Sequence, residues 1–515
     1  MWLTHTFTTN ARLYGSKVAL KEGDRTVTYK ELEQRTNALI KYFRSVGLQK
    51  GDRVAVLSKN SIEVIETLVS CFKCGMIGVP LNHRLTPEKI AYILTDCTAD
   101  ALVISPEFTG FLSSKLYNTK NLKTMLVTNE PCAGLKFYNE VVEQLAEANR
   151  VKLEDQDPAA IIYTSGTTGN PKGVTLSRRA LLEVAKLFCL ELNIEVADRT
   201  LNVMPLFHSG GLAWALSHLC RGATGVVLSD FQVKHVLEVM DRERISSVHL
   251  VPTMIAMMLR EADIARYDFS TLKTILYAGS SMPLPLLKKA MEVFGPNKFV
   301  QMYGQTEHGP TISCLSRQEH ILAVQPDASQ QAKELLTSCG LPMLNVNARI
   351  MQNGQEVPLG EIGEITCRGE SMMNGYWNNP DLTKKKIVDG WLYTGDMGKM
   401  DKNGYIYIVD RKEDMIISGG ENVYPSEVES VIYEHPAVAE VAVVGQRDEI
   451  WGERTVAAVT IRDGFNNLKE EELIEWCRGR IAGYARPRNV YFFEELPKSA
   501  AGKVLRKVLR EQFQQ

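Results

Sequence analysis

Short apolar, β-branched runs alternate with helix-length segments up to about residue 340. Residues 53–57 (RVAVL) form one such run, and residues 61–73 have helical spacing with Ser61 as the expected N-cap. Further runs occupy residues 101–104, 123–127, 160–164, 223–228, 247–251 and 274–277. Strands that alternate with helices are typical of parallel sheets covered by helices, so the pattern predicts the α/β class.

The pattern changes beyond residue 340. Residues 346–351, 363–368 and 404–409 form short strand-like runs separated by NG, GE and DKNG turns, which indicates a β-rich unit. A compact α+β pattern follows residues 410–413 (DRKE), with predicted strands at 438–444, 456–461 and 491–493 and a helix at 470–481.

The length of 515 residues suits about three structural units and a small terminal domain. We predict a large N-terminal domain of helix-covered sheets with a β-rich subdomain, followed by a small mobile α+β C-terminal domain. The predicted boundaries are 1–410 for the large domain (subdomains 1–155, 156–340 and 341–410), 411–413 for a hinge, and 414–515 for the small domain.

Charge and cysteine usage exclude several classes of protein. Lys plus Arg is 59 and Asp plus Glu is 61, a net charge of −2, which argues against a nucleic-acid binder. The ten cysteines are scattered, and the pair Cys71 and Cys74 has no second CxxC or His pair to complete a zinc site. Reduced thiols, no signal-like start and no membrane-length apolar run predict a cytoplasmic protein without a membrane span.

The most specific chemical signal is YTSGTTGNPKGV at residues 163–174, directly after an apolar run. Glycines let backbone N–H groups approach an anion, hydroxyls donate hydrogen bonds, and lysine adds a positive charge. The segment therefore predicts a phosphate-binding loop, with a flexible Gly/Ser/Thr surface turn as the alternative. It differs from a Walker A loop, because GxxxxGK[ST] does not occur in the chain.

Four further motifs follow in order: YGQTE at 303–307, YTGD at 393–396, DRKEDMIISGGENVYPSE at 410–427 and PKSAAGK at 497–503. Together with the loop at 163–174, this set resembles the adenylate-forming superfamily, which includes acyl-CoA synthetases, firefly luciferase and peptide-synthetase adenylation domains. The resemblance covers nearly the whole chain.

The resemblance implies an ATP site with a bound Mg²⁺. It places Tyr303 against adenine, Thr306 on phosphate, Glu307 on the metal ion and Asp396 on both ribose hydroxyls. The implied ATP/AMP-binding residues are Thr164, Ser165, Gly166, Thr167, Thr168, Gly169, Lys172, Gly279, Ser280, Tyr303, Gly304, Gln305, Asp396 and Arg411. A turn aspartate at 396 and an interdomain ion pair at 411 are the alternatives.

The same resemblance assigns the catalytic lysine to Lys503, the last residue of PKSAAGK, in preference to Lys498 and Lys507. A cation there would stabilise the charge that develops at the α-phosphorus. Glu413 takes the hinge position, where Asp or Lys is commoner in relatives. The implied CoA-binding residues are Gly419, Gly420, Trp451, Tyr484 and Arg486, with structural packing as the alternative for the aromatic ones.

The acid is predicted from the segments expected to form its pocket, 208–214, 254–258, 278–281 and 308–313. They are small or apolar and contain no Arg or Lys, which favours a medium- or long-chain aliphatic or an aromatic monocarboxylic acid. Leu212 stands where some long-chain relatives carry a gating tryptophan, and Trp214 is two residues further on. The residues expected at the acyl group are His208, Gly211, Ala278, His308 and Gly309. A buried structural histidine is an equal alternative for His208.

The sequence thus predicts an AMP-forming acyl-CoA synthetase with Lys503, Glu307, Thr306 and His208 as catalytic residues. The acid and MgATP would give acyl-AMP and pyrophosphate, and CoA would then give acyl-CoA and AMP. ATP, Mg²⁺ and coenzyme A are the expected cofactors and co-substrates, with a homodimer as one option for the assembly. The alternatives are an adenylating enzyme that serves a carrier protein, and a nucleotide-binding regulator without turnover.

Overall fold

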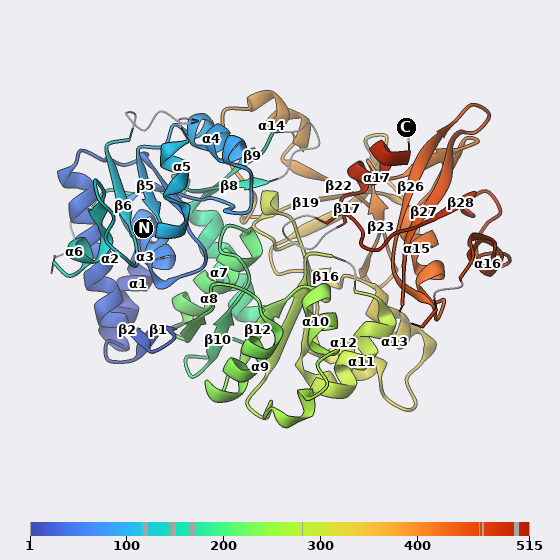
Figure 1. Cartoon of the computed structure of the whole chain (residues 1–515), viewed down its shortest axis with the longest axis horizontal. Helices are drawn as coiled ribbons and strands as arrows, with labels where there is room; N and C mark the ends of the chain where they lie inside the picture. Colours follow the sequence, from blue (N-terminus) through green and yellow to red (C-terminus); the bar gives the residue numbers. More distant parts are fainter. Residues whose placement is uncertain are drawn as a thin grey trace. The chain divides into compact units, whose positions relative to one another are not determined.

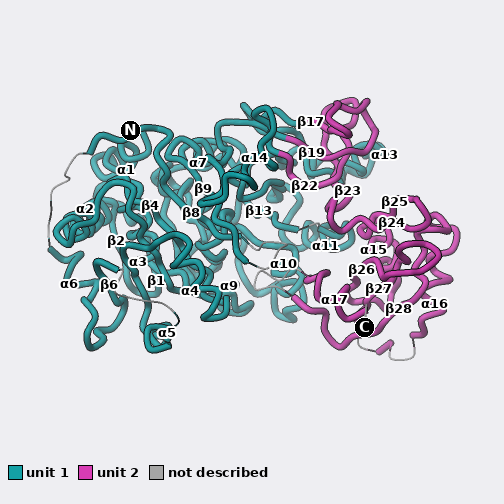
Figure 2. The backbone as a smooth tube through the Cα atoms, turned by 90° about the horizontal axis from the view of Figure 1, so that it is seen from above, with its two compact units in different colours: residues 1–348, 367–392 teal, residues 349–366, 393–515 magenta. Residues whose placement is uncertain are grey.

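The computed structural model describes residues 2–114, 116, 122–144, 146, 151–164, 170–280, 282–462, 464–465, 468–498 and 504–513. The chain divides into unit 1, residues 1–348 and 367–392, and unit 2, residues 349–366 and 393–515 (Figure 2). Within the described part of the chain, no helix is long and apolar enough to cross a bilayer.

Sheet A in unit 1 is parallel in its centre and antiparallel at both edges. Its strands, in spatial order, are β16 (Leu341–Pro342), β15 (Ser313–Leu315), β14 (Phe299–Tyr303), β13 (Thr274–Ala278), β12 (Ser247–Leu250), β10 (Arg199–Asn202), β11 (Thr224–Val227), β1 (Val18–Glu22) and β2 (Arg25–Thr28). The strands from β14 to β1 run parallel, as predicted for strands joined by helices. Their carboxyl ends therefore meet at one edge of the sheet.

Sheet B, also in unit 1, ends in a hairpin rather than in parallel strands. Its order is β20 (Gly375–Tyr376), β9 (Lys172–Ser177), β8 (Pro158–Thr164), β4 (Ile77–Pro80), β3 (Arg53–Leu57), β5 (Ala101–Ile104), β6 (Thr124–Val127) and β7 (Lys136–Phe137). Strands β8 and β9 pair antiparallel, and β20 pairs antiparallel with β9.

The two remaining sheets contain the β-rich and α+β parts of the chain. Sheet C has the order β18 (Gln355–Glu356), β17 (Asn347–Gln352), β19 (Gly363–Arg368), β22 (Trp391–Met400) and β21 (Ile387–Val388), and β23 (Ile406–Arg411) pairs with β22. Sheet D has the order β25 (Glu421–Val423), β24 (Ile416–Ser418), β27 (Gly452–Ile461) and β26 (Val438–Asp448), and β28 (Asn489–Phe492) pairs with β27.

Helices lie on both faces of sheet A. The α-helices of unit 1 are α1 (Trp2–Leu13), α2 (Tyr29–Ser45), α3 (Ile62–Cys74), α4 (Pro87–Asp96), α5 (Gly110–Ser113), α6 (Tyr138–Val142), α7 (Arg178–Glu191), α8 (Ser209–Arg221), α9 (Val233–Arg242), α10 (Pro252–Met258), α11 (Leu284–Phe294), α12 (Arg317–Ala323), α13 (Gln330–Glu334) and α14 (Pro380–Lys386). Those of unit 2 are α15 (Pro425–Tyr433), α16 (Glu470–Trp476) and α17 (Arg506–Phe513). Apolar residues of α9, α10 and α11 pack on one face of sheet A in a single core cluster.

Helix α8 lies on the other face of sheet A, next to α7 (Figure 1). Buried Trp214 donates from Nε1 to Leu201 O of β10 at 3.1 Å, and His218 Nε2 lies 3.0 Å from Ser247 Oγ of β12. Leucines of α8 also face α3 across a narrow apolar gap. This packing holds α8 against sheet A, and the site described below begins at the N-terminal end of this helix.

The predicted α/β class is confirmed, and the predicted strand runs all fall on observed strands. Ser61 caps α3 as expected, since its side chain accepts from Val64 N. The helix predicted at 470–481 is wrong in length, because α16 ends at Trp476. Gly479 adopts a φ of +74°, a left-handed conformation that is not compatible with a continuing helix.

Candidate active site

The candidate site starts at the edge of sheet A where its parallel strands end. Open α/β sheets bind ligands beyond the carboxyl ends of their strands, because the loops there converge. The segments that leave this edge include 203–208 after β10, 251–253 after β12, 279–280 after β13 and 304–308 after β14. Three of these four contain residues that the sequence predicted to be functional, namely His208, Gly279 with Ser280, and residues 304–308.

Glu307 and Thr306 are held by hydrogen bonds from other parts of unit 1. Tyr376 of β20 donates its hydroxyl to Glu307 Oε1 at 2.7 Å, and Met373 N donates to Glu307 O at 2.9 Å. Thr306 Oγ1 lies 3.0 Å from Ser209 Oγ in the first turn of α8. Burial and the neighbouring Glu307 charge raise the pKa of Tyr376, so its hydroxyl remains a donor.

The YGQTE motif turns sharply after β14. Tyr303 is buried at the end of the strand, and its carbonyl accepts from Ile312 N at 2.9 Å. A Cβ at Gly304 would lie 2.3 Å from the carbonyl carbon of Pro310, which explains why this position carries glycine. His308 N donates to Gln305 O at 3.0 Å and closes the short 3₁₀ turn Thr306–His308.

The predicted phosphate loop connects β8 and β9. Thr164 and Lys172 are directly opposed at the base of the hairpin, whereas Ser165, Gly166, Thr167, Thr168 and Gly169 lie outside the described residues. Trp377 N donates to Gly173 O at 2.7 Å, next to the pairing of β20 with β9. The base of the loop and Tyr376 are therefore joined through one short strand.

The residues predicted at the acyl group are only partly brought together. His208 precedes α8 at its N-cap, and Ala278 and Gly279 end β13 at the same edge. His308 and Gly309 instead pack against the interior of unit 1. A Cβ on Gly369 would lie 3.3 Å from His308 Nε2, and a Cβ on Gly309 would lie 2.4 Å from Val184 Cγ2.

Two other acyl-pocket expectations concern α8. A Cβ at Gly211 would lie 2.2 Å from Pro205 O, so the missing side chain allows close packing against the backbone. Trp214 is buried in the core and bonded to Leu201 O. It is thus a packing residue in this structure.

In unit 2, the structure pairs the two residues predicted to contact the ribose. Asp396 of β22 and Arg411 of β23 are opposite each other in the sheet, and Arg411 Nε lies 2.7 Å from Asp396 Oδ1. Lys412, next in the chain, donates from its backbone to Gly395 O at 2.8 Å and from its side chain to Glu364 Oε2 at 2.8 Å. Glu413, the predicted hinge residue, is exposed.

The residues predicted to bind CoA lie on the surface of unit 2. Gly419 N donates to Trp451 O at 2.8 Å, and a Cβ at Gly419 would lie 2.6 Å from the Trp451 ring. Gly420 follows it with a φ of +87°. Trp451 is 45% exposed, and the guanidinium of Arg488 lies 5.9 Å from its ring centre. Tyr484 and Arg486 lie in the segment before β28.

Lys503 and Ser281 lie outside the described residues. On the two sides of residues 499–503, Lys498 and Val504 form an antiparallel bridge, and Leu505 N donates to Pro497 O at 2.8 Å. Lys498 is engaged with Glu440 Oε1 at 2.8 Å. Arg506 of α17 is paired with Glu429 at 2.8 Å.

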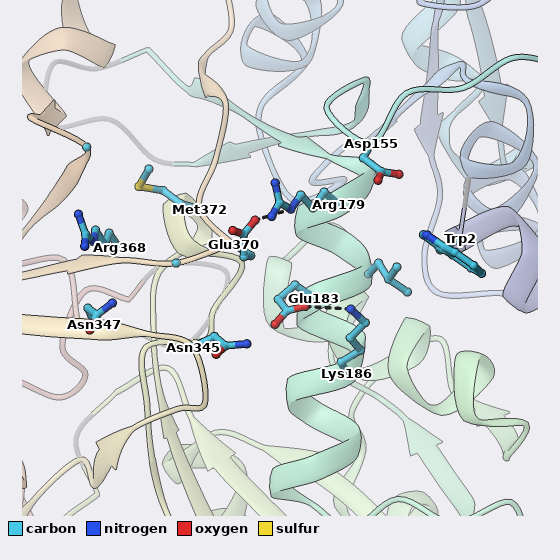
Figure 3. A pocket seen from close by; sticks show the side chains of 13 residues that line it. Trp2, Asp155, Arg179, Glu183, Lys186, Asn345, Asn347, Arg368, Glu370 and Met372 are labelled. Carbon is cyan, nitrogen blue, oxygen red and sulfur yellow. Dashed lines mark hydrogen bonds and ion pairs between the residues drawn. The ribbon is translucent and has the colours of Figure 1, made fainter.

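A separate cleft of about 760 Å³ lies beside α7 in unit 1 (Figure 3). In Figure 3, Arg179 points to Glu370, and Lys186 points to Glu183. The charged side chains that line this cleft are largely paired with one another, which does not suit a phosphate-binding site. Gly369, which lines the cleft, lies against His308.

The donor set fits the predicted magnesium ion. Mg²⁺ is commonly held by one or two carboxylates together with substrate phosphates. Among the described residues, no group of three or more His, Cys, Asp or Glu side chains could form a protein cage for a metal ion. A single oriented carboxylate, Glu307, agrees with an ion bound mainly through ATP.

Comparison with known proteins identifies the family. The family model for AMP-binding enzyme matches residues 7–377, and that for AMP-binding enzyme C-terminal domain matches residues 427–503. The chain belongs to the AMP-binding enzyme family. This confirms the resemblance to adenylate-forming enzymes, and makes the chain an ATP-dependent, adenylate-forming acid–thiol ligase.

Individual relatives of this AMP-binding enzyme match it over nearly its full length. Fatty acid–[acyl-carrier-protein] ligase ScoC of Streptomyces coeruleorubidus is 34% identical over 95% of the chain and 92% of the relative. Feruloyl-CoA synthase of an Amycolatopsis species is 34% identical over 98% and 97%. The structure of Bacillus subtilis o-succinylbenzoate CoA synthetase with its acyl-adenylate intermediate has a TM-score of 0.84 and 31% identity, covering 98% and 97% of the two chains.

Sequence reasoning missed Tyr376 and Ser209, which hold Glu307 and Thr306. Tyr376 is 69 residues from Glu307 in the chain, and Ser209 is 97 residues from Thr306. The strand that carries Tyr376 has only two residues, too few to produce a periodic signal.

Proposed function

We propose that this AMP-binding enzyme is a carboxylic acid:CoA ligase that acts on an aromatic or fatty monocarboxylic acid. A carboxylate oxygen of the acid attacks the α-phosphorus of ATP, the bond to the β-phosphate oxygen breaks, and pyrophosphate leaves. The thiolate of CoA then attacks the acyl carbon of acyl-AMP, and AMP leaves with the bonding electron pair.

The observation that carries this proposal is the edge of sheet A, where Thr306 and Glu307 are held beside the N-terminal end of α8. Orientation of anionic groups by preorganised donors is the main requirement for phosphoryl-type transfer. When bound, Mg²⁺ would neutralise phosphate charge, and Glu307 would hold it. Thr306 would donate to a phosphate oxygen, and Lys172 would add a positive charge at the base of the phosphate loop.

CoA is proposed as the thiol because unit 2 offers an exposed aromatic surface. Trp451 lies on the side-chain-free backbone of Gly419 and has Arg488 at 5.9 Å from its ring. A purine can stack on an exposed indole ring, and a guanidinium can bind a phosphate. Feruloyl-CoA synthase and o-succinylbenzoate CoA synthetase among the relatives support CoA, whereas ScoC supports the alternative of a carrier protein.

The test is pyrophosphate release by the purified protein with MgATP and a panel of aliphatic and aromatic acids, with and without CoA. We expect release with a subset of acids, and acyl-CoA only when CoA is added. Acyl-AMP formation without any acyl-CoA would instead favour a carrier-protein acceptor, and ATP binding without turnover would favour a regulator. The predicted cytoplasmic location and a homodimer stay predictions, to be checked by fractionation and by light scattering.

A further inference from the structure

Strand β12 presents alternate side chains to α8, and these lead from the core to the edge of sheet A. Ser247 Oγ lies 3.0 Å from His218 Nε2 in the last turn of α8. His249, two residues on, lies against Gly210 in the first turn of α8 and 5.8 Å from the Trp214 ring. Val251 follows at the edge, within 3.5 Å of the Cβ position of Gly279. His249 thus lies one step inward from the candidate site.

His249 is a buried polar group without a hydrogen-bond partner at Nδ1 among the described residues, although only 4% of the residue is exposed. Two other buried histidines, His218 and His320, have hydrogen-bond partners at both ring nitrogens. His218 contacts Trp214 O at 2.8 Å and Ser247 Oγ, and His320 contacts Ser316 O at 2.7 Å and Tyr277 OH at 2.8 Å. An unsatisfied buried polar atom costs about 1–3 kcal/mol, so its retention calls for an explanation.

Protonation does not explain this position. Burial lowers the pKa of His249 to about 4, against the opposing effect of a hydrogen bond with the Gly210 backbone, so the ring is neutral at physiological pH. A neutral imidazole has one donor and one acceptor nitrogen, and can therefore bond a hydroxyl, an amine or a carbonyl group.

Small residues lie beside His249 on α8 and at the end of β13, and Val251 is the next side chain on the same face of β12. A Cβ on Gly210 would lie 3.0 Å from His249 Cε1, so any larger residue there would press on the ring. Glycine in a helix costs about 0.5–1 kcal/mol relative to alanine, which makes its use here informative. Ala278 and Gly279 leave β13 at the same edge and add at most a methyl group. The small residues and the unpartnered nitrogen are independent observations, and both lie at the first turn of α8 or at the carboxyl ends of β12 and β13.

We propose that His249 is a specificity-determining residue that hydrogen-bonds a polar group at the end of the acid opposite its carboxylate. This inference rests on the proposed function. A hydrogen bond to His249 would favour monocarboxylic acids with a ring hydroxyl or amine over unsubstituted aromatic acids and plain alkyl acids. A plain hydrocarbon end would leave His249 unpaired, and sites built to hydrogen-bond a substrate reject analogues that lack the bond.

His308 is another buried histidine with an unpartnered nitrogen, and it is less suited to this role. His308 Nε2 also has no partner among the described residues, but Nδ1 is held by Thr311 O at 2.9 Å and Ser371 Oγ at 3.1 Å. Its unpartnered nitrogen lies against Gly369, which lines the cleft beside α7. His308 is therefore a positioning residue for the 306–308 turn.

The test compares 4-hydroxycinnamate, cinnamate and octanoate by acid-dependent pyrophosphate release at pH 7.5. We expect kcat/KM to be at least about tenfold higher for the hydroxy acid than for cinnamate in the unmodified enzyme. His249→Leu should reduce that ratio to about one, mainly through gain with cinnamate and loss with the hydroxy acid. His249→Gln, which keeps a donor and an acceptor, should retain part of the preference.

His320→Gln is the matched control, because it removes an equally buried histidine whose partners are all internal. It should leave the ratio between the two acids unchanged. Binding of the 4-hydroxycinnamoyl and cinnamoyl sulfamoyl-adenosine analogues, measured by calorimetry, gives the same ratio without turnover. An equal affinity for the two analogues, or a ratio that His249→Leu does not alter, would overturn the proposal for His249 while leaving the ligase activity intact. No release with any acid and no analogue binding would overturn both.

Discussion

The two units present their candidate functional residues in different ways. In unit 1, Glu307 and Thr306 are held by side chains from distant strands and helices, Tyr376 and Ser209. In unit 2, Arg411, Trp451 and Tyr484 are each more than 40% exposed on the surface. The arrangement in unit 1 fixes the functional side chains before a ligand binds, and the arrangement in unit 2 leaves them accessible to a ligand from solvent.

The difference matches the two half-reactions. Adenylation requires several anionic groups to be aligned, and a small misplacement lowers the rate strongly. This favours a preorganised site. Thioester formation requires a large soluble co-substrate to arrive and leave, which favours an exposed recognition surface. Substitutions in unit 1 should therefore affect chemistry more strongly than those at the surface of unit 2.

Lys503→Ala should have the largest effect, because it would remove the cation predicted to stabilise the adenylation transition state. We expect a loss of about 10²–10³ in the rate of acyl-AMP formation, with little change in thioester formation from supplied acyl-AMP. Separate assays of acyl-AMP formation and of thioester formation measure the two rates. Lys498→Ala is the control, since Lys498 is engaged with Glu440. Equal loss of both half-reactions would contradict a role confined to adenylation.

Tyr376→Phe should have the next largest effect, because it releases the carboxylate of Glu307. We expect the Mg²⁺ concentration for half-maximal adenylation to rise about tenfold, in line with one lost hydrogen bond to a charged group. Calorimetric binding of ATP should weaken with Mg²⁺ and stay the same in its absence. Tyr42→Phe, which removes a hydroxyl 2.7 Å from Thr124 Oγ1, is the control. An unchanged Mg²⁺ requirement would show that Tyr376 only supports the fold.

Trp451→Ala should have a smaller and more selective effect. Loss of one exposed stacking surface should raise the KM for CoA about fivefold and leave pyrophosphate release without CoA unchanged. Phe465→Ala is a suitable control, because Phe465 is also 45% exposed. If both variants bind CoA as the unmodified enzyme does, the nucleotide end of CoA contacts another surface.

The smallest effect concerns stability in weak acid. Burial lowers the pKa of His218, His249, His308 and His320 to about 4. Between the unfolded value of about 6.5 and pH 4, the unfolded chain binds protons that the folded chain does not, so stability is lost as pH falls. At pH 5.5, one unit below the unfolded pKa, each histidine should lower the free energy of unfolding by about 1.4 kcal/mol. Thermal unfolding at pH 7.5 and 5.5 should differ by several degrees, and by less in His320→Gln.

The fold was predictable where a local pattern carries the information. Residues 53–57 and 101–104 are strands with the predicted bounds, because a short β-branched run between polar segments has few other solutions. The order of strands was not predictable. The strand β1 pairs with β11 more than 200 residues later, and no local spacing encodes that contact.

The candidate site shows the same division. The motifs at 163–174 and 303–307 predict phosphate and metal binding from their residue types, and these roles stay predictions. The structure places Thr306 and Glu307 beyond the end of β14, and Thr164 opposite Lys172 at the base of their hairpin. The sequence could not show in which direction each side chain points. His308 and Gly309 stand next to Glu307 in the chain but face inward, and His249, in no motif, is brought beside Gly210 by the packing of α8 on β12.

The pairing of β20 with β9 has a consequence for how the chain is made. Residues 375–376 complete the edge of a sheet whose other strands have already left the ribosome about 200 residues earlier. Until then, β9 is an open edge strand next to the phosphate loop, and Glu307 lacks its tyrosine partner. Nucleotide-binding competence should thus appear late in synthesis, and nascent chains that stop before Tyr376 should be the ones that need a chaperone.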